Sequence, residues 1–455
     1  KVQSLREQEG NKGYASGYIV GGAVRDYWTG RETGDHDFLV IGDAAKFAEQ
    51  VRTELSGGKV VTFPKFGTSF FVHNESKLEF TEPKIPVTGL SETEIVKGDL
   101  EQRAFTFNAA AAKLTTEEKL TVYDPFDGYG DLERKILRTP LDPAVTFGDD
   151  PLRLLRVFRF GAQFDLKSAE GVMDAVILTA PLLEGVSGER IGEEILKILD
   201  LPKPSEALGP MYLTGVMENI LPEVANLAGV EKHGKFNHKD ILRHTFKVVD
   251  NAAKAGGDTM TRLAALLHDV AKPMTKRFDP VEGFTFHGHE DLGSRIAGKI
   301  GKRLRLTREN VRLIQKLTRL HMRPVNLVSA EVTDSAIRRL MTQAGEDMER
   351  QLILCRADIT SGNPRKVKRY LTNFDRMTER MKEVESKDQV RAFQSPVRGE
   401  EIMEICGLEP GPMVGKIKKA IEEAILDGEI VNEYDPAREY LLAHKEEWLE
   451  DKLKA

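Results

Sequence analysis

The chain has 455 residues, of which 40% are hydrophobic and 30% are charged, a composition typical of globular proteins and not of disordered ones. A chain of this length has more residues than one hydrophobic core usually organises, so we expect two to four domains. The formal net charge of −6 argues against nonspecific binding of nucleic acid by bulk charge, although clustered basic residues can still bind RNA.

No uninterrupted apolar run approaches the roughly 18 residues of a membrane span, and no signal-peptide pattern opens the sequence. The two cysteines, Cys355 and Cys406, lie far apart in unlike contexts, which favours free thiols over a disulfide. We therefore expect a cytoplasmic protein that makes no membrane contact.

Residues 18–40, YIVGGAVRDYWTGRETGDHDFLV, predict a strand, a glycine pair (Gly21 and Gly22), a short helix, a polar turn and a second strand. Side chains of a strand alternate between its faces, so Asp35 and Asp37 point the same way. Adjacent carboxylates repel, and a cation between them is the chief reason for such a pair. The glycines let backbone N–H groups approach an anion at the start of a helix. The stretch therefore indicates chemistry on a nucleoside triphosphate.

This combination resembles the signature of the polymerase-β-like nucleotidyltransferases. The sequence GGAVRD is similar to the corresponding motif of the class II tRNA nucleotidyltransferases (CCA-adding enzymes) and of the related bacterial poly(A) polymerases. The resemblance implies that Asp35 and Asp37 hold two Mg²⁺ ions, which neutralise the triphosphate and activate a 3′-hydroxyl for attack on the α-phosphorus. Arg25, on the helix after the glycine pair, is expected to bind two phosphate oxygens, with Asp26 as its orienting partner.

A third acidic residue, Glu79, stands between two apolar residues in the strand-like run 78–80. Two other strand-like runs, residues 59–63 and 68–72, precede it, after a predicted amphipathic helix over residues 44–55. Nucleotidyltransferases of this superfamily carry such an acid on a neighbouring strand, so the resemblance implies a third metal-site carboxylate. An edge-strand acid that faces water is the alternative.

Residues 81–98 are mostly polar, and we predict a loop there. Residues 99–108, DLEQRAFTFN, then resemble the family element RRDFT-x-N. Arg103 and Asn108 match that element and are implied nucleotide-binding residues, whereas Ala104 stands where the family has Asp. The missing carboxylate would remove a polar contact near the metals or the primer, which puts full activity in question.

Residues 149–159, DDPLRLLRVFR, predict a helix on which Asp150, Arg153 and Arg156 share one face. By themselves an acid and an arginine one turn apart are most often an exposed ion pair of little energetic value. The stretch resembles the family's E/D-D-x-x-R motif, whose acid and arginine act as a protein template that selects C or A. The resemblance therefore implies base recognition by Asp150 and Arg153, with Arg156 and Arg159 also at the nucleotide.

A further helix is predicted over residues 187–199, SGERIGEEILKIL, with Ser187 as its N-cap. It resembles the family's ERI-x-x-E-L-x-K motif. Glu189 and Arg190 are expected to organise the neighbouring site and not to take part in chemistry.

Seven of the ten histidines lie between His233 and His321. The order His244, His268-Asp269 and Asp358 resembles the HD superfamily of metal-dependent phosphohydrolases. Imidazole and carboxylate ligands on several helices suit Mn²⁺, Fe²⁺, Ni²⁺ or Zn²⁺, with a water left to attack a phosphate. The alternative is a helical folding module with satisfied core histidines and no hydrolysis.

The last part of the chain combines charged helical patterns with a Pro- and Gly-bearing loop. Basic residues cluster in residues 298–306, 312–323 and 365–382 and again near the start of the amphipathic pattern 414–426. Such a tail is suited to phosphate contacts with the outer part of an RNA. Residues 393–421 are similar in wording to the C-terminal part of bacterial tRNA nucleotidyltransferases that carry an HD domain.

The resemblance extends over about residues 14–440 and implies an α+β fold. We expect a nucleotidyltransferase head with about five strands over residues 1–140 and an all-helical neck for base recognition over residues 141–225. An HD body over residues 226–365 and a helical, RNA-binding tail over residues 366–455 follow.

The implied function is addition of C and A to tRNA 3′ ends from CTP and ATP, without a nucleic-acid template. The expected partners are tRNA and the two nucleotides, and the expected cofactors are Mg²⁺ and a second divalent metal in the HD site. Three alternatives stay open: a poly(A) polymerase or an enzyme that adds only A or CC, an HD phosphohydrolase with an impaired head, and a non-catalytic RNA-binding protein.

Overall fold

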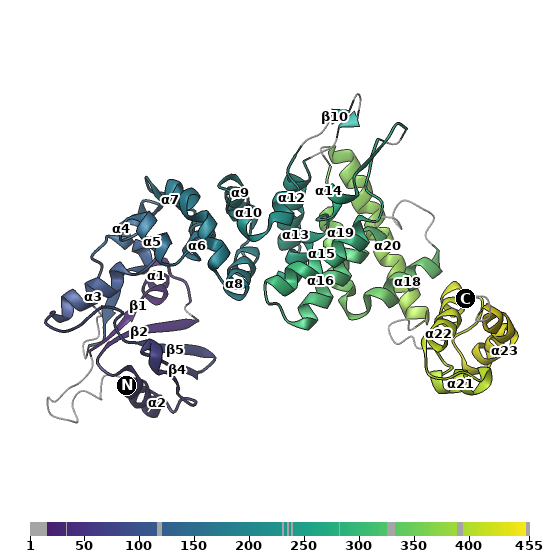
Figure 1. Ribbon diagram of the computed structural model, residues 1–455, viewed down its shortest axis with the longest axis horizontal. Helices are drawn as coiled ribbons and strands as arrows, with labels where there is room; N and C mark the ends of the chain where they lie inside the picture. The colour runs from purple at the N-terminus through teal and green to yellow at the C-terminus, as the bar shows by residue number, and fades with distance from the viewer. Residues whose placement is uncertain are drawn as a thin grey trace. The chain divides into compact units, whose positions relative to one another are not determined.

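The structure is a computed structural model, and it describes residues 16–32, 34–115, 121–229, 232–233, 236–237, 240–281, 283–324, 333–361, 363–388 and 395–451. The chain divides into two compact units, Lys1–Ala225 and Asn226–Ala455. The first contains a sheet with helices and the second is almost entirely helical (Figure 1), so the expected α+β fold class is confirmed. The finer division into head, neck, body and tail stays a prediction.

The first unit contains a seven-stranded sheet in the order β3-β4-β5-β2-β1-β6-β7. Its strands are β1 (Ser16–Val20), β2 (Asp35–Ile41), β3 (Val61–Phe63), β4 (Thr68–His73), β5 (Ser76–Thr81), β6 (Ala111–Lys113) and β7 (Val122–Tyr123). Only β2 and β5 pair in parallel among these described strands. The prediction of about five strands was wrong, because β6 and β7 are too short to show an alternating pattern in the sequence.

Two helices cover opposite faces of this sheet. Helix α2 (Ala44–Leu55) packs with Phe38 and Val40 of β2, and α3 (Glu92–Glu101) packs with Leu39 between them. Because side chains alternate along a strand, Asp37 lies on the same face as Leu39, toward α3. The short helix α1 (Gly22–Thr29) follows β1 directly.

Helix α3 occupies much of the stretch for which a loop was predicted, so that prediction was wrong over residues 92–98. Ser91 and Glu94 form a capping box: the Ser91 hydroxyl accepts from the Glu94 N–H, and the Glu94 carboxylate accepts from the Ser91 N–H. This S-x-x-E pattern marks a helix start even where the following residues are polar. Ile95 and Val96 then bury one face of the helix.

After the sheet, the first unit continues as short helices with one pair of two-residue strands, β8 (Ile136–Leu137) and β9 (Lys167–Ser168). The helices are α4 (Gly128–Glu133), α5 (Pro143–Asp149), α6 (Arg153–Phe164), α7 (Val172–Thr179), α8 (Gly188–Leu199), α9 (Ser205–Leu213), α10 (Val216–Ile220) and α11 (Pro222–Ala225). Asp150 lies between α5 and α6 in an extended conformation, so the expectation of one helix that contains both Asp150 and Arg153 was wrong. Ser187 caps α8 as predicted.

The second unit is built mainly from helices, and residues in or directly after five of them, α12, α13, α15, α16 and α19, form a histidine cluster. Their bounds are α12 (Ile241–Lys254), α13 (Thr259–Leu267), α14 (Lys272–Thr275), α15 (His289–Arg303), α16 (Arg308–Leu320), α18 (Asp334–Ala344), α19 (Met348–Asp358), α20 (Pro364–Asp388), α21 (Gly399–Cys406), α22 (Pro412–Asp427) and α23 (Tyr434–Asp451). Two hairpins are formed by β10 (Lys232–His233) with β11 (Phe236–Asn237) and by β12 (Arg277–Asp279) with β13 (Gly283–Thr285).

The amphipathic helix predicted near the C-terminus is present as α22, whose Ile417, Ile421 and Ile425 pack against α21 and α23. Residues 393 and 394, the first two of the stretch that resembles bacterial relatives, lie outside the described residues. Cys355 and Cys406 are buried and free, as predicted. Among the described helices none is long and apolar enough to cross a lipid bilayer.

Candidate active site and candidate metal centre

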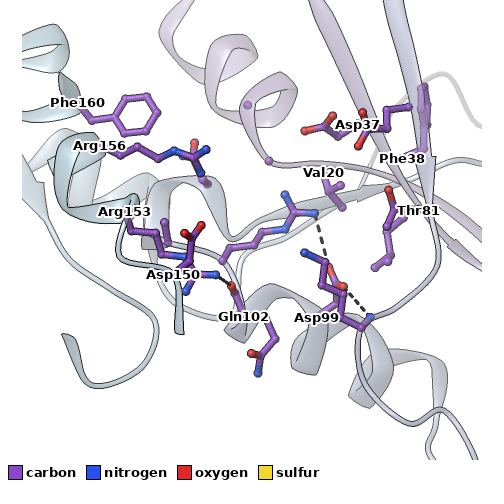
Figure 2. Close-up of a pocket in the computed structure, with 18 of the residues that line it drawn as sticks. Val20, Asp37, Phe38, Thr81, Asp99, Gln102, Asp150, Arg153, Arg156 and Phe160 are labelled. Carbon is purple, nitrogen blue, oxygen red and sulfur yellow. Dashed lines mark hydrogen bonds and ion pairs between the residues drawn. The ribbon is translucent and has the colours of Figure 1, made fainter. Parts of the chain in front are cut away.

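A cavity of about 470 Å³ lies in the first unit, between the sheet, the end of α3 and the start of α6 (Figure 2). All of the predicted head and neck site residues except Asp35 and Arg25 line it. Its polar wall contains Gly21, Gly22, Asp37, Glu79, Asp99, Gln102, Arg103, Asn108, Asp150, Arg153, Arg156 and Arg159.

The acidic side of the cavity is formed by two neighbouring strands. Asp37 of β2 pairs in register with Glu79 of β5, and Asp35 lies two residues earlier on the same strand. The Asp37 side chain reaches solvent, but the protein atoms around it partly desolvate its carboxyl and raise its pKa; Glu79 and Asp35 add to the rise, and Arg103 and Lys77 oppose it. Lys77 forms an ion pair with Glu79. Three carboxylates so close together are an arrangement that a divalent cation stabilises.

Gly21 forms the bend between β1 and α1, with φ 70° and ψ −128°. A Cβ at this position would lie 2.6 Å from Nη1 of Arg103 and 3.6 Å from Oδ2 of Asp37. The backbone conformation therefore favours glycine, and a Cβ here would in addition displace the end of the Arg103 side chain. The bend places the N-terminus of α1, which favours anions, in the same cavity as the carboxylates.

Arg25 does not line the cavity wall, and its predicted contact with phosphate stays a prediction. Its side chain is buried, and its Nε and Nη1 donate to Asp26 and Asn108, each over 2.8 Å. The guanidinium also lies over the rings of Phe160 and Phe164. The predicted pairing with Asp26 is present, and the effect of Arg25 on the cavity is to hold Asn108 in its wall. Asp35, also outside the wall, is exposed to solvent.

The end of α3 supplies the next part of the wall. Arg103 lies beside Gly21, and its Nη2 is 3.6 Å from Oδ2 of the buried Asp99. Sequence reasoning missed Asp99, although its spacing of four residues from Arg103 was a signal for an ion pair on a helix. Ala104 lines the cavity and offers no polar atom from its side chain.

Asp150, Arg153 and Arg156 face the cavity from the side opposite Asp37 (Figure 2). Asp150 does not pair with Arg153: both of its carboxylate oxygens accept from Nη2 of Arg190, at 3.0 Å. Arg153 donates to the backbone carbonyls of Gln102 and Thr146, over 2.7 and 3.0 Å. The expected role of Arg190 in organising this side of the site agrees with its contact.

A buried carboxylate holds the other two arginines. Glu194 of α8 is 2% exposed and accepts from Nε of Arg156 at 3.1 Å and from Nε of Arg159 at 2.8 Å. Burial by itself raises the pKa of Glu194, but the two arginines reverse the effect and hold it below its ordinary value. Glu194 was not among the predicted residues, since its place in an amphipathic helix did not distinguish it from its exposed neighbour Glu193.

In the second unit the four predicted metal ligands come together from three helices. Nε2 of His244, in α12, is 3.0 Å from Oδ1 of Asp358 at the end of α19. His268 and Asp269 follow α13, and Nε2 of His268 is 3.2 Å from Oδ2 of Asp269. Sequence reasoning left His289 and His321 as extra histidines. The structure places both beside Asp269.

The residues of this cluster fit a metal ion. Nε2 of His268 and Oδ1 of Asp269 are buried, and neither makes a hydrogen bond of regular geometry among the described residues, although Nε2 of His268 lies 3.2 Å from Oδ2 of Asp269. A buried polar atom without a partner costs about 1–3 kcal/mol, which a coordinated cation would remove. Imidazole nitrogens and carboxylate oxygens are ligands suited to first-row divalent metals.

The buried charges of the cluster shift one another's pKa values. Burial by itself would lower the pKa of His268, but Asp269 and Asp358 reverse this and raise it to about 10. Burial and the neighbouring His268 lower the pKa of His321 to about 4. Burial alone would raise the carboxyl pKa of Asp269 and Asp358, yet the adjacent histidines hold both pKa values well below normal.

Three family profiles match this chain. "Poly A polymerase head domain" matches residues 17–138, "Probable RNA and SrmB- binding site of polymerase A" matches residues 166–227, and "HD domain" matches residues 241–363. The CC-adding tRNA nucleotidyltransferase of Thermus thermophilus is 30% identical over 93% of both chains. The Multifunctional CCA protein of Xylella fastidiosa is 30% identical over 75% of this chain and 83% of its own.

The chain belongs to the class II CCA-adding enzymes with an HD domain. It is therefore a nucleotidyltransferase of tRNA processing. The A-adding tRNA nucleotidyltransferase of Deinococcus radiodurans is also similar, at 28% identity over 90% of this chain and 92% of its own. Members of the family thus differ in which nucleotides they add.

Solved structures of the CCA-adding family have the same fold. The enzyme of Bacillus stearothermophilus in complex with CTP superposes with a TM-score of 0.66, at 22% identity, over 100% of this chain and 97% of that one. The Thermotoga maritima CCA-adding enzyme complexed with tRNA gives a TM-score of 0.56 at 22% identity, over 94% and 91%. The nucleotidyltransferase head and the HD domain both imply dependence on divalent metal ions.

Proposed function

We propose that this enzyme adds C and A to tRNA 3′ ends from CTP and ATP, with the protein itself selecting the base. The observation that carries the proposal is that Asp37, Glu79 and the Gly21 bend share one cavity with Asp150 and Arg153. A single bound nucleotide would then place its reactive phosphates at Asp37, Glu79 and Gly21 and its base at Asp150 and Arg153.

In this proposal Asp37 and Glu79, with Asp35 beside them, would hold Mg²⁺, and a bound ion would supply charge neutralisation of the triphosphate and a lower pKa of the attacking 3′-hydroxyl. The 3′-oxygen bonds to the α-phosphorus while the bond to pyrophosphate breaks, and the chain contributes positioning and charge. Arg103 is next to the Gly21 bend and supplies positive charge to the phosphates.

Base selection would rest on the residues opposite the carboxylates. The Asp150 carboxylate can accept a hydrogen bond from the exocyclic amine of C or A, since its contact with Arg190 leaves lone pairs unused. Arg153 would donate to a ring nitrogen or carbonyl of the base. Its two backbone carbonyl contacts fix the guanidinium in the wall before the nucleotide arrives. This fixed geometry is what a protein template needs.

For tRNA we propose contacts between phosphates and the basic residues of the tail. Lys416 and Lys419 of α22 are exposed, while the apolar face of that helix is buried against its neighbours. Such contacts position an RNA without reading its sequence.

A second activity is favoured by one observation, the unsatisfied buried atoms of His268 and Asp269. We propose that the HD cluster holds a divalent ion, with Mn²⁺, Ni²⁺, Fe²⁺ and Zn²⁺ as candidates, and hydrolyses a phosphate ester. The ion would supply an activated water, and His244 and Asp358 would complete its ligand set.

Primer extension tests the first proposal. Transfer RNA ending before the CCA sequence, or after its first or second C, is incubated with Mg²⁺ and CTP, ATP or both. Completion of CCA on all three substrates is expected. Addition of CC only, of the final A only, or of long A runs would overturn the CCA assignment in favour of the corresponding alternative.

Variants separate the head from the HD site. Asp37→Asn should abolish nucleotide addition, whereas Glu133→Gln, which removes an exposed acid at the end of α4, should not. His268→Ala should abolish any phosphatase activity and leave addition intact. If wild type hydrolyses phosphate esters but incorporates no nucleotide at any Mg²⁺ concentration, the HD site is the main activity.

A further inference from the structure

The sheet face that bears Asp37 and Glu79 continues beyond the cavity onto the outer strands β4 and β3. Residues that pair in register on neighbouring strands point their side chains to the same face of a sheet. Glu79 of β5 pairs with Phe70 of β4, and Phe70 pairs with Val61 of β3. The carboxylates of the candidate active site and the side chains of these outer strands therefore share one continuous face.

The outer part of this face is apolar and open to solvent. We call it the outer face and define it by Val61, Phe63, Phe70 and Val72, which alternate along β3 and β4. Val61, Phe63 and Val72 are 39%, 45% and 50% exposed, whereas Phe71, on the opposite face of β4, is buried beneath α2. Large apolar side chains that gather on one exposed surface mark a contact site, unlike those that are scattered singly.

A row of contacts joins the outer face to the carboxylates. The rings of Phe63 and Phe70 are stacked, with 6.1 Å between their centroids and 17° between their planes. Nζ of Lys77 lies 4.7 Å from the centroid of the Phe70 ring, and the same ammonium group forms an ion pair with Glu79. Phe70 is thus fixed by Lys77 and Phe63, and Phe63 keeps an exposed aromatic surface at the end of the row.

The reaction of this enzyme class fixes what has to lie near this face. Transfer of a nucleotide to tRNA brings the 3′-hydroxyl of the RNA to the carboxylates, so the nucleotides that precede this hydroxyl leave the cavity past one of its walls. In the proposed function the wall opposite Asp37 holds the base of the incoming nucleotide, which leaves the sheet side for the RNA. Neighbouring strands are about 4.8 Å apart, so β3 is about 10 Å from β5 and within reach of these nucleotides.

We propose that the outer face binds the unpaired 3′ end of the RNA substrate, with one base stacked on Phe63 and the stack continued by Phe70. The inference deepens the proposed activity of the head and rests on the placement of the reacting phosphates at Asp37 and Glu79. Unpaired RNA bases are commonly bound by stacking on aromatic side chains, and some RNA-binding proteins present these on a sheet face. Stacking tolerates any base, which suits an RNA whose last nucleotide changes after each addition.

Binding of RNA in the absence of nucleotide tests the inference with the full chain. The ligand is tRNA that ends after its second C, either unmodified or with an abasic nucleotide at one of its last three positions. Phe63→Ala should bind the unmodified tRNA with roughly 5-fold to 100-fold lower affinity, the effect of one lost stacked base. In wild type one of the abasic positions should cause a loss of the same size, and Phe63→Ala should be insensitive to that change.

Two further variants separate stacking from general effects. Phe63→Tyr keeps an aromatic ring and should bind the tRNA as wild type does. Tyr129→Ala is the matched control, because Tyr129 is 47% exposed and has a ring contact of its own with Trp28, yet it lies on α4 and not on the sheet. This variant should also keep the wild-type affinity.

The possible results are distinct. Equal affinities of wild type and Phe63→Ala for unmodified tRNA would overturn the inference, and a change of oligomeric state in that variant would then assign the outer face to a second copy of the chain. Phe63→Ala that binds weakly but stays sensitive to every abasic position would also overturn it, because no base would be stacked on Phe63. If Phe63→Ala does not fold, Phe63→Leu, which keeps an apolar side chain without a ring, replaces it.

Failure of the proposed function would look different. If the binding results are as expected but wild type adds no nucleotide to tRNA, the proposed function fails and the outer face stays an RNA-binding site. If wild type completes CCA and Phe63→Ala binds and extends tRNA equally well, only the inference about the outer face is wrong.

Discussion

Replacement of Gly21 by alanine is expected to separate backbone strain from loss of catalysis. The added Cβ would lie 2.6 Å from Nη1 of Arg103, a distance at which one of the two groups must move. The arginine is the flexible partner, so it would leave its place beside Asp37 and weaken its contact with Asp99.

The magnitude has two parts. A backbone with φ 70° and ψ −128° is strained for any residue with a Cβ, by about 1–3 kcal/mol, and this strain lowers stability. Displacement of Arg103 removes one preorganised cationic donor from the proposed phosphate site. A loss of this kind lowers kcat by about 100-fold to 1,000-fold, or about 2.7–4 kcal/mol in transition-state stabilisation.

The second unit offers a matched control. Gly345 has nearly the same backbone conformation, with φ 54° and ψ −131°, but a Cβ there would meet no atom within 4 Å. Gly345→Ala should therefore lose similar stability and keep the wild-type rate. Arg103→Ala should lose the rate without the backbone strain.

The assays are incorporation of CTP into tRNA lacking its CCA end, measured at saturating nucleotide, and urea denaturation of each variant. If Arg103→Ala keeps the rate of Gly345→Ala, then Arg103 does not act on the phosphates. Equal rates for Gly21→Ala and wild type would show in addition that the cavity accommodates the Cβ, and the argument from the glycine bend would be refuted.

Three further changes test other parts of the first unit. Glu194→Gln leaves Arg156 and Arg159 without their buried carboxylate and should reduce the free energy of unfolding by about 3 kcal/mol, measured as a lower urea midpoint. The control Glu193→Gln changes an exposed neighbour and should have almost no effect. Equal urea midpoints for the two variants would contradict the stabilising role of the ion pairs. Asp150→Ala should reduce discrimination of CTP and ATP against UTP and GTP by roughly 10-fold to 100-fold, which corresponds to one or two lost hydrogen bonds to a base. Unchanged discrimination in assays with single nucleotides would exclude a role of Asp150 in base recognition. Glu92, for which burial alone would raise the pKa, is held at about 2 by hydrogen bonds from Lys113 and Tyr18; because its folded pKa is below the unfolded value of 4.5, its contribution is complete above pH 4.5 and is lost as the pH falls toward 2. The urea midpoints of wild type and Glu92→Gln should therefore converge on acidification, and a constant difference would contradict the shift.

Local sequence patterns were sufficient to predict the helices and strands that contain most of the candidate catalytic residues. The strand, glycine pair, helix and D-x-D strand were predicted in order, and alternation along β2 correctly placed Asp35 and Asp37 on one face. These features depend on residues within one or two elements, where side-chain direction follows directly from backbone geometry. Short elements were the exceptions: β6 and β7 contain too few residues to show a period, and α3 was missed because its capping box precedes a mostly polar helix.

Only the tertiary structure decided which residues meet. Parallel pairing of β5 with β2 places Glu79 beside Asp37. The fold of the first unit brings Arg190 to Asp150, so Asp150 forms its ion pair with Arg190 and not with Arg153. Burial, which no local pattern reports, places Arg25 outside the cavity wall and in contact with Asn108. The same reason applies to the HD cluster, since the position of His289 and His321 around Asp269 follows from the packing of separate helices and not from their spacing in the chain.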